Sequence, residues 1–382
     1  MMDVGHVALV TPRLIKRDGQ GRVNYEVVRR WLSLGGSVTA VTCDVAPELL
    51  RERRFHWVRA GINWLPTSLL RSQAFSVQAT RWLERHRSRF DIIHANGSVT
   101  LARTDVNSCH FVHRAWGASA AHTSSSSRNA YGLYHRMLTE LHARQERIAY
   151  ARAGCVVAVS DHVRAQLVET GVEREKIRVI WNGIDVNEFS PGIADRLALG
   201  IAHNGFLAFF AGDMRTPRKN LDTVLQAIRT VPDIHLVVAG DLKKNPYPAK
   251  VQELGMAERV TFLGFRPDIA KIMRAVDAFV YPARYEPLGL VVLEALASGL
   301  PVITASTTGA SALVDESCGI VLRNPEDAAG LGTALERLAS DPALRRRMGE
   351  AARERALTHT WQRMAEEYTK LYEHIVTQRC RS

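Results

Sequence analysis

The amino-acid sequence predicts an α/β protein built from two doubly wound, parallel-sheet domains. Short apolar and β-branched runs alternate with helical stretches along the chain, which is typical of parallel strands joined by crossover helices. The chain has 382 residues, which is more than one hydrophobic core usually holds. The alternation lapses once, near the middle, and then starts again, so we expect the domain boundary there.

The first domain is expected to span residues 1–190. Helical periodicity covers Val23–Leu34 and Tyr131–Ala153, and strands are predicted at His6–Val10, Val38–Cys43, Asp91–His94, Val156–Val159 and Ile177–Ile180. The polar segment Ser119–Asn129 cannot bury enough surface to offset the entropy of ordering. We expect a mobile loop there, and a lid on the acceptor side is the functional alternative.

The second domain is expected to span residues 191–359, after a linker near residues 186–204. Its predicted strands are Phe206–Ala211, His235–Gly240, Val260–Phe262, Ala278–Tyr281, Pro301–Thr304 and Gly319–Leu322. A last amphipathic helix, at about residues 360–377, is expected to cross back and join the first domain. Ligands of such sheets bind at the carboxyl ends of the strands, so we expect the two domains to face a central cleft.

Positive charge is concentrated in the first domain. The formal net charge is +11, and residues 1–190 hold 26 Lys/Arg against 17 Asp/Glu, whereas residues 191–382 hold 24 against 22. The densest stretch, Arg51–Arg89, has nine arginines among aromatic and aliphatic residues. This composition suits a segment facing an anionic membrane surface, and equally a solvated helix face over a packed apolar side. We expect no nucleic acid partner, because no motif for binding one accompanies the charge.

Composition also bears on location and metal content. The sequence has no apolar run of the ~20 residues that a membrane span needs, and its start lacks the features of a secretory signal. A cytoplasmic protein is expected, with peripheral attachment to the inner membrane face as an option. The five cysteines are an odd number without C-x-x-C spacing, which argues against a disulfide framework and a zinc site.

The most informative stretch is Glu286–Gly299. It follows a predicted strand, bends at Pro287 and Gly289, and starts a helix that carries a second carboxylate, Glu294, eight residues after Glu286. The first turn of a helix offers free backbone N–H groups to a phosphate, here from Leu290 and Val291, and carboxylates accept hydrogen bonds from sugar hydroxyls. Two glutamates at this spacing are also common on solvated helices, so the neighbouring Pro-x-Gly carries the argument.

With this stretch, the chain resembles retaining glycosyltransferase family 4, which has the GT-B fold of two Rossmann-like domains. Other segments fall in that family's order and spacing, namely Val159-Ser160, Val179–Asp185 with Phe189 and Pro191, and Gly212–Asn220. The resemblance implies an enzyme of the hexosyltransferase type, acting in cell-surface glycan, lipopolysaccharide or glycolipid biosynthesis. It places Glu286 against hydroxyls of the donor sugar and Glu294 against the ribose of a nucleotide-diphosphate sugar.

The segment Gly212–Lys219 is where the family sets an Arg and a Lys against the donor diphosphate. Cations are needed there, because the departing diphosphate gains negative charge as the glycosidic bond breaks. Lys219 matches the family's lysine, whereas Asp213 stands where the family has its arginine. Arg215 or Arg218 is expected to take over that role.

Two further groups come from the first domain. Gly19 and Gly21 lie between the first strand and the first helix, where glycines let backbone amides approach a phosphate; an ordinary turn is the alternative. His110 matches the family's histidine beside the donor sugar, with a structural histidine as the alternative. His113 is a second candidate, and His94 is expected to line the acceptor side.

The predicted reaction is transfer with retention, from a nucleotide-diphosphate sugar to a glycan or lipid-linked acceptor. The catalytic residues implied by the resemblance are Glu286, His110 and Lys219. No cofactor is expected and no metal either, since the sequence has no Asp-x-Asp motif and Lys219 with helix amides supplies the positive charge. The alternatives are a GT-B protein that binds a nucleotide sugar or a membrane without turnover, and a sugar-nucleotide epimerase.

Overall fold

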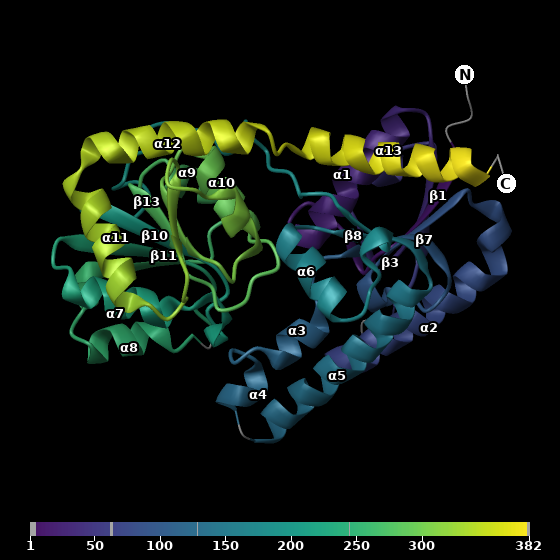
Figure 1. The fold of residues 1–382 in the computed structure, drawn as a ribbon, viewed down its shortest axis with the longest axis horizontal. Coiled ribbons are helices and arrows are strands. Elements are labelled where there is room, and N and C mark those ends of the chain that lie inside the picture. Colours follow the sequence, from purple (N-terminus) through teal and green to yellow (C-terminus); the bar gives the residue numbers. More distant parts are fainter. Residues whose placement is uncertain (1–4, 62–63, 128, 244, 380–382) are drawn as a thin grey trace. The chain divides into compact units, whose positions relative to one another are not determined.

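The structure is a computed structural model that describes residues 5–61, 64–127, 129–243 and 245–379. The chain forms two compact units. The first comprises residues 1–118, 127–183 and 361–382, and the second comprises residues 119–126 and 184–360 (Figure 1).

The first unit contains a parallel sheet with the strand order β5-β3-β1-β6-β7-β8-β9. Its strands are β1 (His6–Val10), β3 (Ser37–Thr42), β5 (Phe55–Arg59), β6 (Ile92–Asn96), β7 (Thr104–Cys109), β8 (Ala153–Ala158) and β9 (Ile177–Val179). Two short strands, β2 (Arg13–Leu14) and β4 (Asp44–Val45), pair beside it. The strand order reverses between β1 and β6, so loops after these two strands leave to opposite sides.

The two faces of this sheet are covered by different helices, as the alternation of residues along β1 requires. Val7 and Leu9 pack with α1 (Gly19–Ser33) and α13 (Trp361–Arg379), whereas Ala8 and Val10 pack with α2 (Ser68–His86). The remaining helices of the unit are α3 (His113–Ala118), α5 (Ala130–Ala151) and α6 (Asp161–Glu169).

The second unit contains a parallel sheet with the order β12-β11-β10-β13-β14-β15. Its strands are β10 (Phe206–Ala211), β11 (Ile234–Ala239), β12 (Val260–Gly264), β13 (Ala278–Tyr281), β14 (Val302–Ala305) and β15 (Gly319–Leu322). Its helices are α4 (Thr123–Ser126), α7 (Leu221–Thr230), α8 (Tyr247–Glu253), α9 (Ile269–Met273), α10 (Leu290–Ala297), α11 (Ala328–Ser340) and α12 (Pro342–Leu357). Here the strand order reverses between β10 and β13.

The predicted class of two parallel-sheet α/β domains is confirmed, and each predicted strand overlaps an observed one. Besides the two-residue strands β2 and β4, two strands of the seven-stranded sheet were not predicted, for physical reasons. The edge strand β5 shows little apolar alternation because most of its side chains face water. The interior strand β7 is fully buried but reads Thr-Asp-Val-Asn-Ser-Cys, and the side chains of Asp105, Asn107 and Ser108 form hydrogen bonds with neighbouring segments.

The arginine-rich stretch Arg51–Arg89 is not one interfacial segment. It contains β5, a connecting loop and α2, and the apolar face of α2 packs on the sheet through Phe75, Ala79 and Leu83. The predicted loop at Ser119–Asn129 is partly helical, because α4 forms one turn and Asn129 caps α5; position 128 lies outside the described residues. In the part of the chain that the structure describes, no helix is long and apolar enough to cross a membrane.

Asn220 joins three segments of the second unit. It is the one non-glycine residue with positive φ (64°) among the described residues, and its side-chain oxygen caps α7 by accepting from the Thr223 backbone N–H at 3.3 Å. Its side-chain amide donates to the backbone oxygens of Pro282 (3.0 Å) and Pro325 (2.7 Å). Asn220 is buried, so these hydrogen bonds fix the loop that ends at Lys219 against the loop after β13.

We expect Asn220→Ala to lower the free energy of unfolding by about 2–3 kcal/mol, because it removes a cap, leaves buried carbonyls unpaired and keeps a strained left-handed backbone. Asn220→Gly should recover about 1 kcal/mol of this loss by relieving the strain alone. Asp327→Ala is the matched control, since Asp327 caps α11 and should cost only about 1 kcal/mol. Denaturant titration measures all three, and equal losses at the two caps would contradict the joining role of Asn220.

Candidate active site

The second unit gathers its candidate residues where the order of its strands reverses. The loop after β10 runs from Gly212 to Lys219, and the loop after β13 runs from Pro282 to Gly289. Since β10 and β13 are parallel neighbours, both loops leave the same edge of the sheet. Carboxyl-terminal edges at such a reversal are where open α/β sheets bind their ligands.

Glu286 is the centre of this site. Lys219 donates from Nζ to the Glu286 Oε2, Tyr281 donates its hydroxyl to the same oxygen at 3.0 Å, and the Arg218 guanidinium lies 3.8 Å from it. The Lys219 Nζ also lies 5.3 Å from the centre of the Tyr281 ring. Only 11% of the Lys219 side chain and 13% of the Glu286 side chain are exposed, so this is a largely buried ion pair.

The electrostatics of the pair keep the carboxylate ionised. Burial alone would raise the pKa of Glu286, but the charges of Lys219 and Arg218, with the hydrogen bonds from Lys219 and Tyr281, hold that pKa below its ordinary value. Burial lowers the pKa of Lys219, and the charge of Glu286 offsets part of that effect. Burial also raises the pKa of Tyr281, so its hydroxyl stays protonated as a donor.

Arg284 holds the loop that carries the two cations. Its backbone N–H donates to the Arg218 backbone oxygen at 2.9 Å, and its guanidinium donates to the Pro217 backbone oxygen at 2.6 Å. The same guanidinium is anchored by the carboxylates of Asp222 (3.1 Å) and Glu326 (2.5 Å). No local motif indicates this function of Arg284, because its partners lie far from it along the chain.

Helix α10 begins directly beside Glu286. Its N-cap Gly289 has φ 90°, and a Cβ there would lie 3.0 Å from the Thr308 side chain, so the close approach requires glycine. Leu290 and Val291 form the first turn, where backbone N–H groups have no partner inside the helix. Glu294 lies one turn further on, and burial together with the charge of Glu188 raises its pKa to about 7.

Of the two arginines considered for the diphosphate, Arg218 lies in the cluster and Arg215 does not. Arg215 makes a two-pronged pair with Asp213, at 2.9 Å and 2.7 Å, and its side chain is 56% exposed. Asp213 therefore neutralises Arg215, whereas Arg218 is 25% exposed and faces Glu286. The geometry favours Arg218 for the missing arginine's role.

The first unit has a cavity of about 570 Å³ at the equivalent place in its own sheet. Pro12 after β1 and Gly97 after β6 line it, together with His110 and Gln20. The His110 Nε2 lies 3.2 Å from the Asn96 Oδ1, and burial lowers the pKa of His110 to about 4, so the ring is neutral. The volume lies in the range of small-molecule sites.

The glycines near the first helix are held by local structure. Helix α1 starts at Gly19, and the Gly21 N–H donates to the capping carboxylate of Asp18 at 2.7 Å. A Cβ on Gly21 would lie 2.8 Å from the Ile15 backbone oxygen, so packing alone requires glycine there. Of this turn, Gln20 is the residue that lines the cavity.

The other two histidines differ in role. His113 lines the cavity and pairs through Nδ1 with Glu146 at 2.6 Å. His94 does not line the acceptor side as predicted, because it is completely buried. Its Nδ1 lies 2.6 Å from the Tyr372 hydroxyl and its Nε2 lies 2.7 Å from the Ser108 hydroxyl, so both nitrogens are occupied in anchoring α13 to the sheet.

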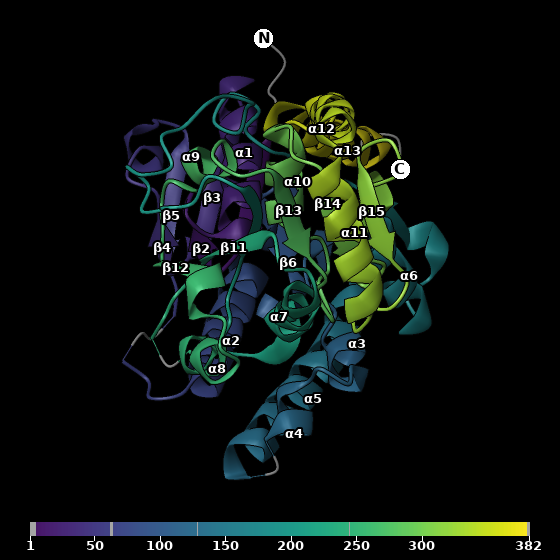
Figure 2. The ribbon, with the colours of Figure 1, turned by 90° about the vertical axis from the view of Figure 1, so that its left-hand side faces the viewer.

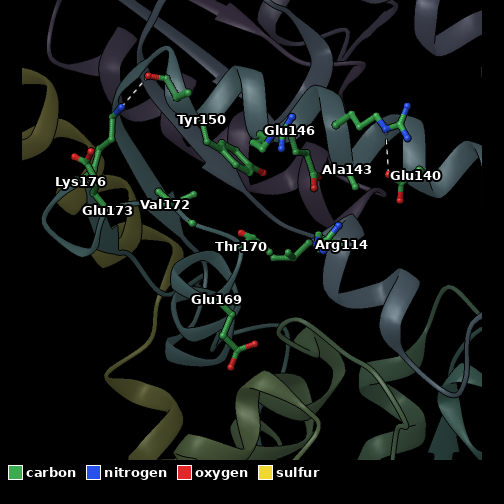
Figure 3. Close-up of a pocket in the computed structure, with 15 residues that line it drawn as sticks. Arg114, Glu140, Ala143, Glu146, Tyr150, Glu169, Thr170, Val172, Glu173 and Lys176 are labelled. Carbon is green, nitrogen blue, oxygen red and sulfur yellow. Dashed lines mark hydrogen bonds and ion pairs between the residues drawn. The ribbon is translucent and has the colours of Figure 1, made fainter.

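A second cavity of about 900 Å³ lies in the first unit between α5 and the segment after α6 (Figure 3). Basic and acidic side chains mix along it, including Arg114, Lys176, Glu169 and Glu173, and the Lys176 Nζ donates to the Ala151 backbone oxygen at 3.0 Å. The balanced charges give it no preference for an anion. Within the described residues, no group of three or more His, Cys, Asp or Glu side chains could hold a metal ion.

Comparisons with known proteins agree with this architecture. Residues 194–355 match the family described as glycosyl transferases group 1, and residues 17–188 match the one described as glycosyltransferase family 4. The chain is 31% identical over 317 residues to the D-inositol 3-phosphate glycosyltransferase of Mycolicibacterium gilvum, covering 78% of this chain and 69% of that protein.

Two solved structures share the fold. WaaG, a glycosyltransferase involved in lipopolysaccharide biosynthesis, superimposes with a TM-score of 0.76 at 22% identity, covering 96% of this chain and 99% of that one. HepE of Anabaena, in complex with UDP-glucose, superimposes with a TM-score of 0.73 at 19% identity, covering 98% and 100%.

Because Lys219 and Glu286 are buried together, removing either charge should destabilise the second unit. We expect Lys219→Met and Glu286→Gln each to cost about 3 kcal/mol of unfolding free energy, and the double variant to cost less than the sum by about 1 kcal/mol or more. Denaturant unfolding of wild type, the two single variants and the double variant gives the coupling energy of this double-mutant cycle. Additive losses would show that the two side chains do not interact in solution.

Glu294 should make stability depend on pH. Its pKa is raised from 4.5 to about 7, so its contribution is fully present below about pH 4.5 and is lost as the pH rises through about 7. Glu294→Gln removes this loss and should gain about 2 kcal/mol over wild type between about pH 5 and about pH 8. Glu188→Gln is the control. It removes a charge that raises the pKa of Glu294, so the loss of stability should be complete at a lower pH but should not disappear. A constant difference between wild type and Glu294→Gln across this range would refute the assignment.

Proposed function

The chain belongs to the glycosyl transferases group 1 family and is a glycosyltransferase, and on this premise we propose a retaining reaction with a nucleotide-diphosphate sugar as donor. The acceptor is a hydroxyl of a cell-surface glycan, lipopolysaccharide or glycolipid precursor. The enzyme acts in the cytoplasm, at or near the inner face of the membrane. The second unit binds the donor and the first unit binds the acceptor.

The observation that carries this proposal is the pairing of Glu286 with Lys219 and Arg218 beside the start of α10. A nucleotide-diphosphate sugar needs cations and amides for its phosphates and a carboxylate for its sugar hydroxyls. The cluster supplies all of these groups within one buried patch. In this proposal the diphosphate is bound by Lys219, Arg218 and the backbone amides of Leu290 and Val291. Glu286 accepts hydrogen bonds from the sugar hydroxyls, and Glu294 accepts them from the ribose.

The proposed chemistry is one exchange at the anomeric carbon. The bond from this carbon to the diphosphate oxygen breaks, and the acceptor hydroxyl oxygen forms the new bond from the same face. The hydroxyl proton passes to the departing phosphate oxygen, so the products are the glycoside and the nucleoside diphosphate. Lys219 and Arg218 stabilise the charge that develops on the leaving group.

We propose that the reaction needs neither a cofactor nor a metal ion. Arg218 and Lys219 bring two positive charges to the cluster, and these charges supply the electrostatic stabilisation that a divalent cation would otherwise give. The partial positive charge at the start of α10 adds to them.

On the acceptor side, we propose that the cavity of the first unit takes the polar end of the acceptor. The neutral ring of His110 contacts a sugar hydroxyl, and the chain from His110 through Asn96 to Asn24 holds that ring, with Asn96 donating to Asn24 at 3.2 Å. The Mycolicibacterium relative is named for D-inositol 3-phosphate, and this name supports a polyhydroxylated acceptor.

The test starts with a panel of nucleotide sugars that includes UDP-glucose, because a donor at about 100 times its dissociation constant should add roughly 2.7 kcal/mol of stability. With the stabilising donor and an extract of membrane glycolipids, we expect release of nucleoside diphosphate only when acceptor is present, and a product with the donor's anomeric configuration. Activity should survive a strong chelator.

In this assay Arg218→Gln and Glu286→Gln should lower kcat about 10²–10³-fold, because each removes a contact to developing charge or to the sugar. Arg215→Gln is the matched control and should stay within about tenfold of wild type, since Asp213 already neutralises that arginine. An inverted product, or a rate restored only by added magnesium, would overturn the proposal.

A further inference from the structure

Exposed apolar side chains gather at one end of the first unit. Trp64, Leu133 and Met137 are 82%, 60% and 64% exposed, and Leu70 and Tyr131 are also exposed. These five residues, which we call the apolar tip, come from the start of α2 with the loop before it and from the start of α5. Exposed apolar residues are ordinary when scattered, so these five form a binding surface only if the two segments that carry them are neighbours.

Hydrogen bonds bring the two parts of the tip together. The Tyr134 hydroxyl lies 3.0 Å from the Ser68 hydroxyl and accepts from the Leu69 N–H at 3.3 Å. One turn further along, the Ser72 hydroxyl lies 3.2 Å from the His142 Nε2, so α2 and α5 run side by side. The two views of the ribbon show the first turns of α5 extending beyond the strands of the unit's own sheet (Figures 1 and 2).

The charged side chains within the two segments of the tip have one sign. The sequence has no Asp or Glu between Glu52 and Glu84, nor between Asp105 and Glu140, and these intervals supply the whole tip. Arg71 and Arg136 are exposed within it. Aromatic and aliphatic side chains with arginine, and without carboxylates, fit the interface of an anionic bilayer, where Trp and Tyr lie at the level of the headgroups.

The tip borders the cavity of the first unit. Ser68, Arg71 and Ser72 line that cavity, while Leu70, on the same turn of α2, points to solvent. A membrane in contact with the tip would therefore lie next to the place where we expect the polar end of the acceptor.

We propose that the apolar tip docks on an anionic lipid surface, and that the acceptor is a lipid-linked molecule whose polar head enters the adjacent cavity. The identity of the acceptor rests on the proposed function, whereas docking does not. A second copy of this chain fits the tip poorly, because a symmetric contact would set Arg71 and Arg136 of each copy against those of the other. The arginine-rich far end of α2 differs, since Arg87 there already pairs with Asp105 at 3.6 Å.

The test measures binding of the full chain to vesicles of phosphatidylglycerol mixed with phosphatidylcholine, and to vesicles of phosphatidylcholine alone. We expect binding to the anionic vesicles only, with release as salt shortens the reach of surface charge to ~8 Å near physiological ionic strength. The triple variant Trp64→Ser, Leu133→Ser, Met137→Ser should bind about tenfold more weakly or worse, and Arg136→Glu likewise. Lipids with brominated acyl chains should quench tryptophan emission in wild type and much less in Trp64→Ser.

Matched controls are Leu50→Ser with Val168→Ser, which removes exposed apolar residues elsewhere in the unit, and Arg85→Glu at the other end of α2. Both should bind like wild type. Equal binding by the triple variant, equal binding to neutral vesicles, or a dimer that the triple variant dissociates would each overturn the proposal. Donor-dependent transfer to a detergent-dispersed extract of membrane glycolipids is measured in parallel, so that vesicle binding without transfer contradicts the proposed function alone, and transfer without vesicle binding contradicts this inference alone.

Discussion

A carboxylate removed from water must be met by positive charge and hydrogen bonds, and the site of the second unit is built around this requirement at Glu286. Lys219, Arg218 and Tyr281 converge on that one carboxylate, and each comes from a segment next to β10 or β13. Two residues outside the cluster, Asn220 and Arg284, connect the loop after β10 to the loop after β13 by hydrogen bonds. The positive charges of Lys219 and Arg218 neutralise Glu286, and a diphosphate would need positive charges of the same kind. In the proposed reaction, the cations that would bind the diphosphate are thus kept in place by pairing with the carboxylate that would contact the sugar.

Polar burial serves a different purpose in the first unit. Strand β7 carries Asp105, Asn107 and Ser108 into the interior, where they hydrogen-bond the backbones or side chains of neighbouring strands and loops. Ser108 and His94 also hold the hydroxyls of Tyr368 and Tyr372, which fixes the last helix on the sheet. A buried polar group needs its partner at the correct distance, so these contacts specify where α13 packs.

The sheets of the two units share one topological feature. In each, the strand order reverses beside the first strand of the unit, and the loops at the reversal carry the candidate binding residues. In the first unit these loops line a cavity with basic and apolar side chains at its edge, whereas in the second unit they carry a buried ion pair. The difference in net charge between the halves of the sequence has a local origin, because residues 51–150 hold 15 Lys/Arg against 6 Asp/Glu, which equals the net charge of +9 of residues 1–190.

The sequence by itself determined the fold class and the strands with a continuous apolar run, because apolar periodicity is a local property of the chain. Short motifs also singled out Lys219 and Glu286 as candidates, and the structure pairs these two side chains. Only the tertiary structure decided what depends on distant partners. It showed that Arg218 faces Glu286, whereas Arg215 pairs with Asp213. It showed that His94 is buried and anchors α13 through Tyr372. It also identified β7 as a strand although most of its residues are polar. It also divided the arginine-rich stretch into a packed helix face and an exposed end. In each case the deciding contact joins residues far apart in sequence, and no local pattern encodes such a contact.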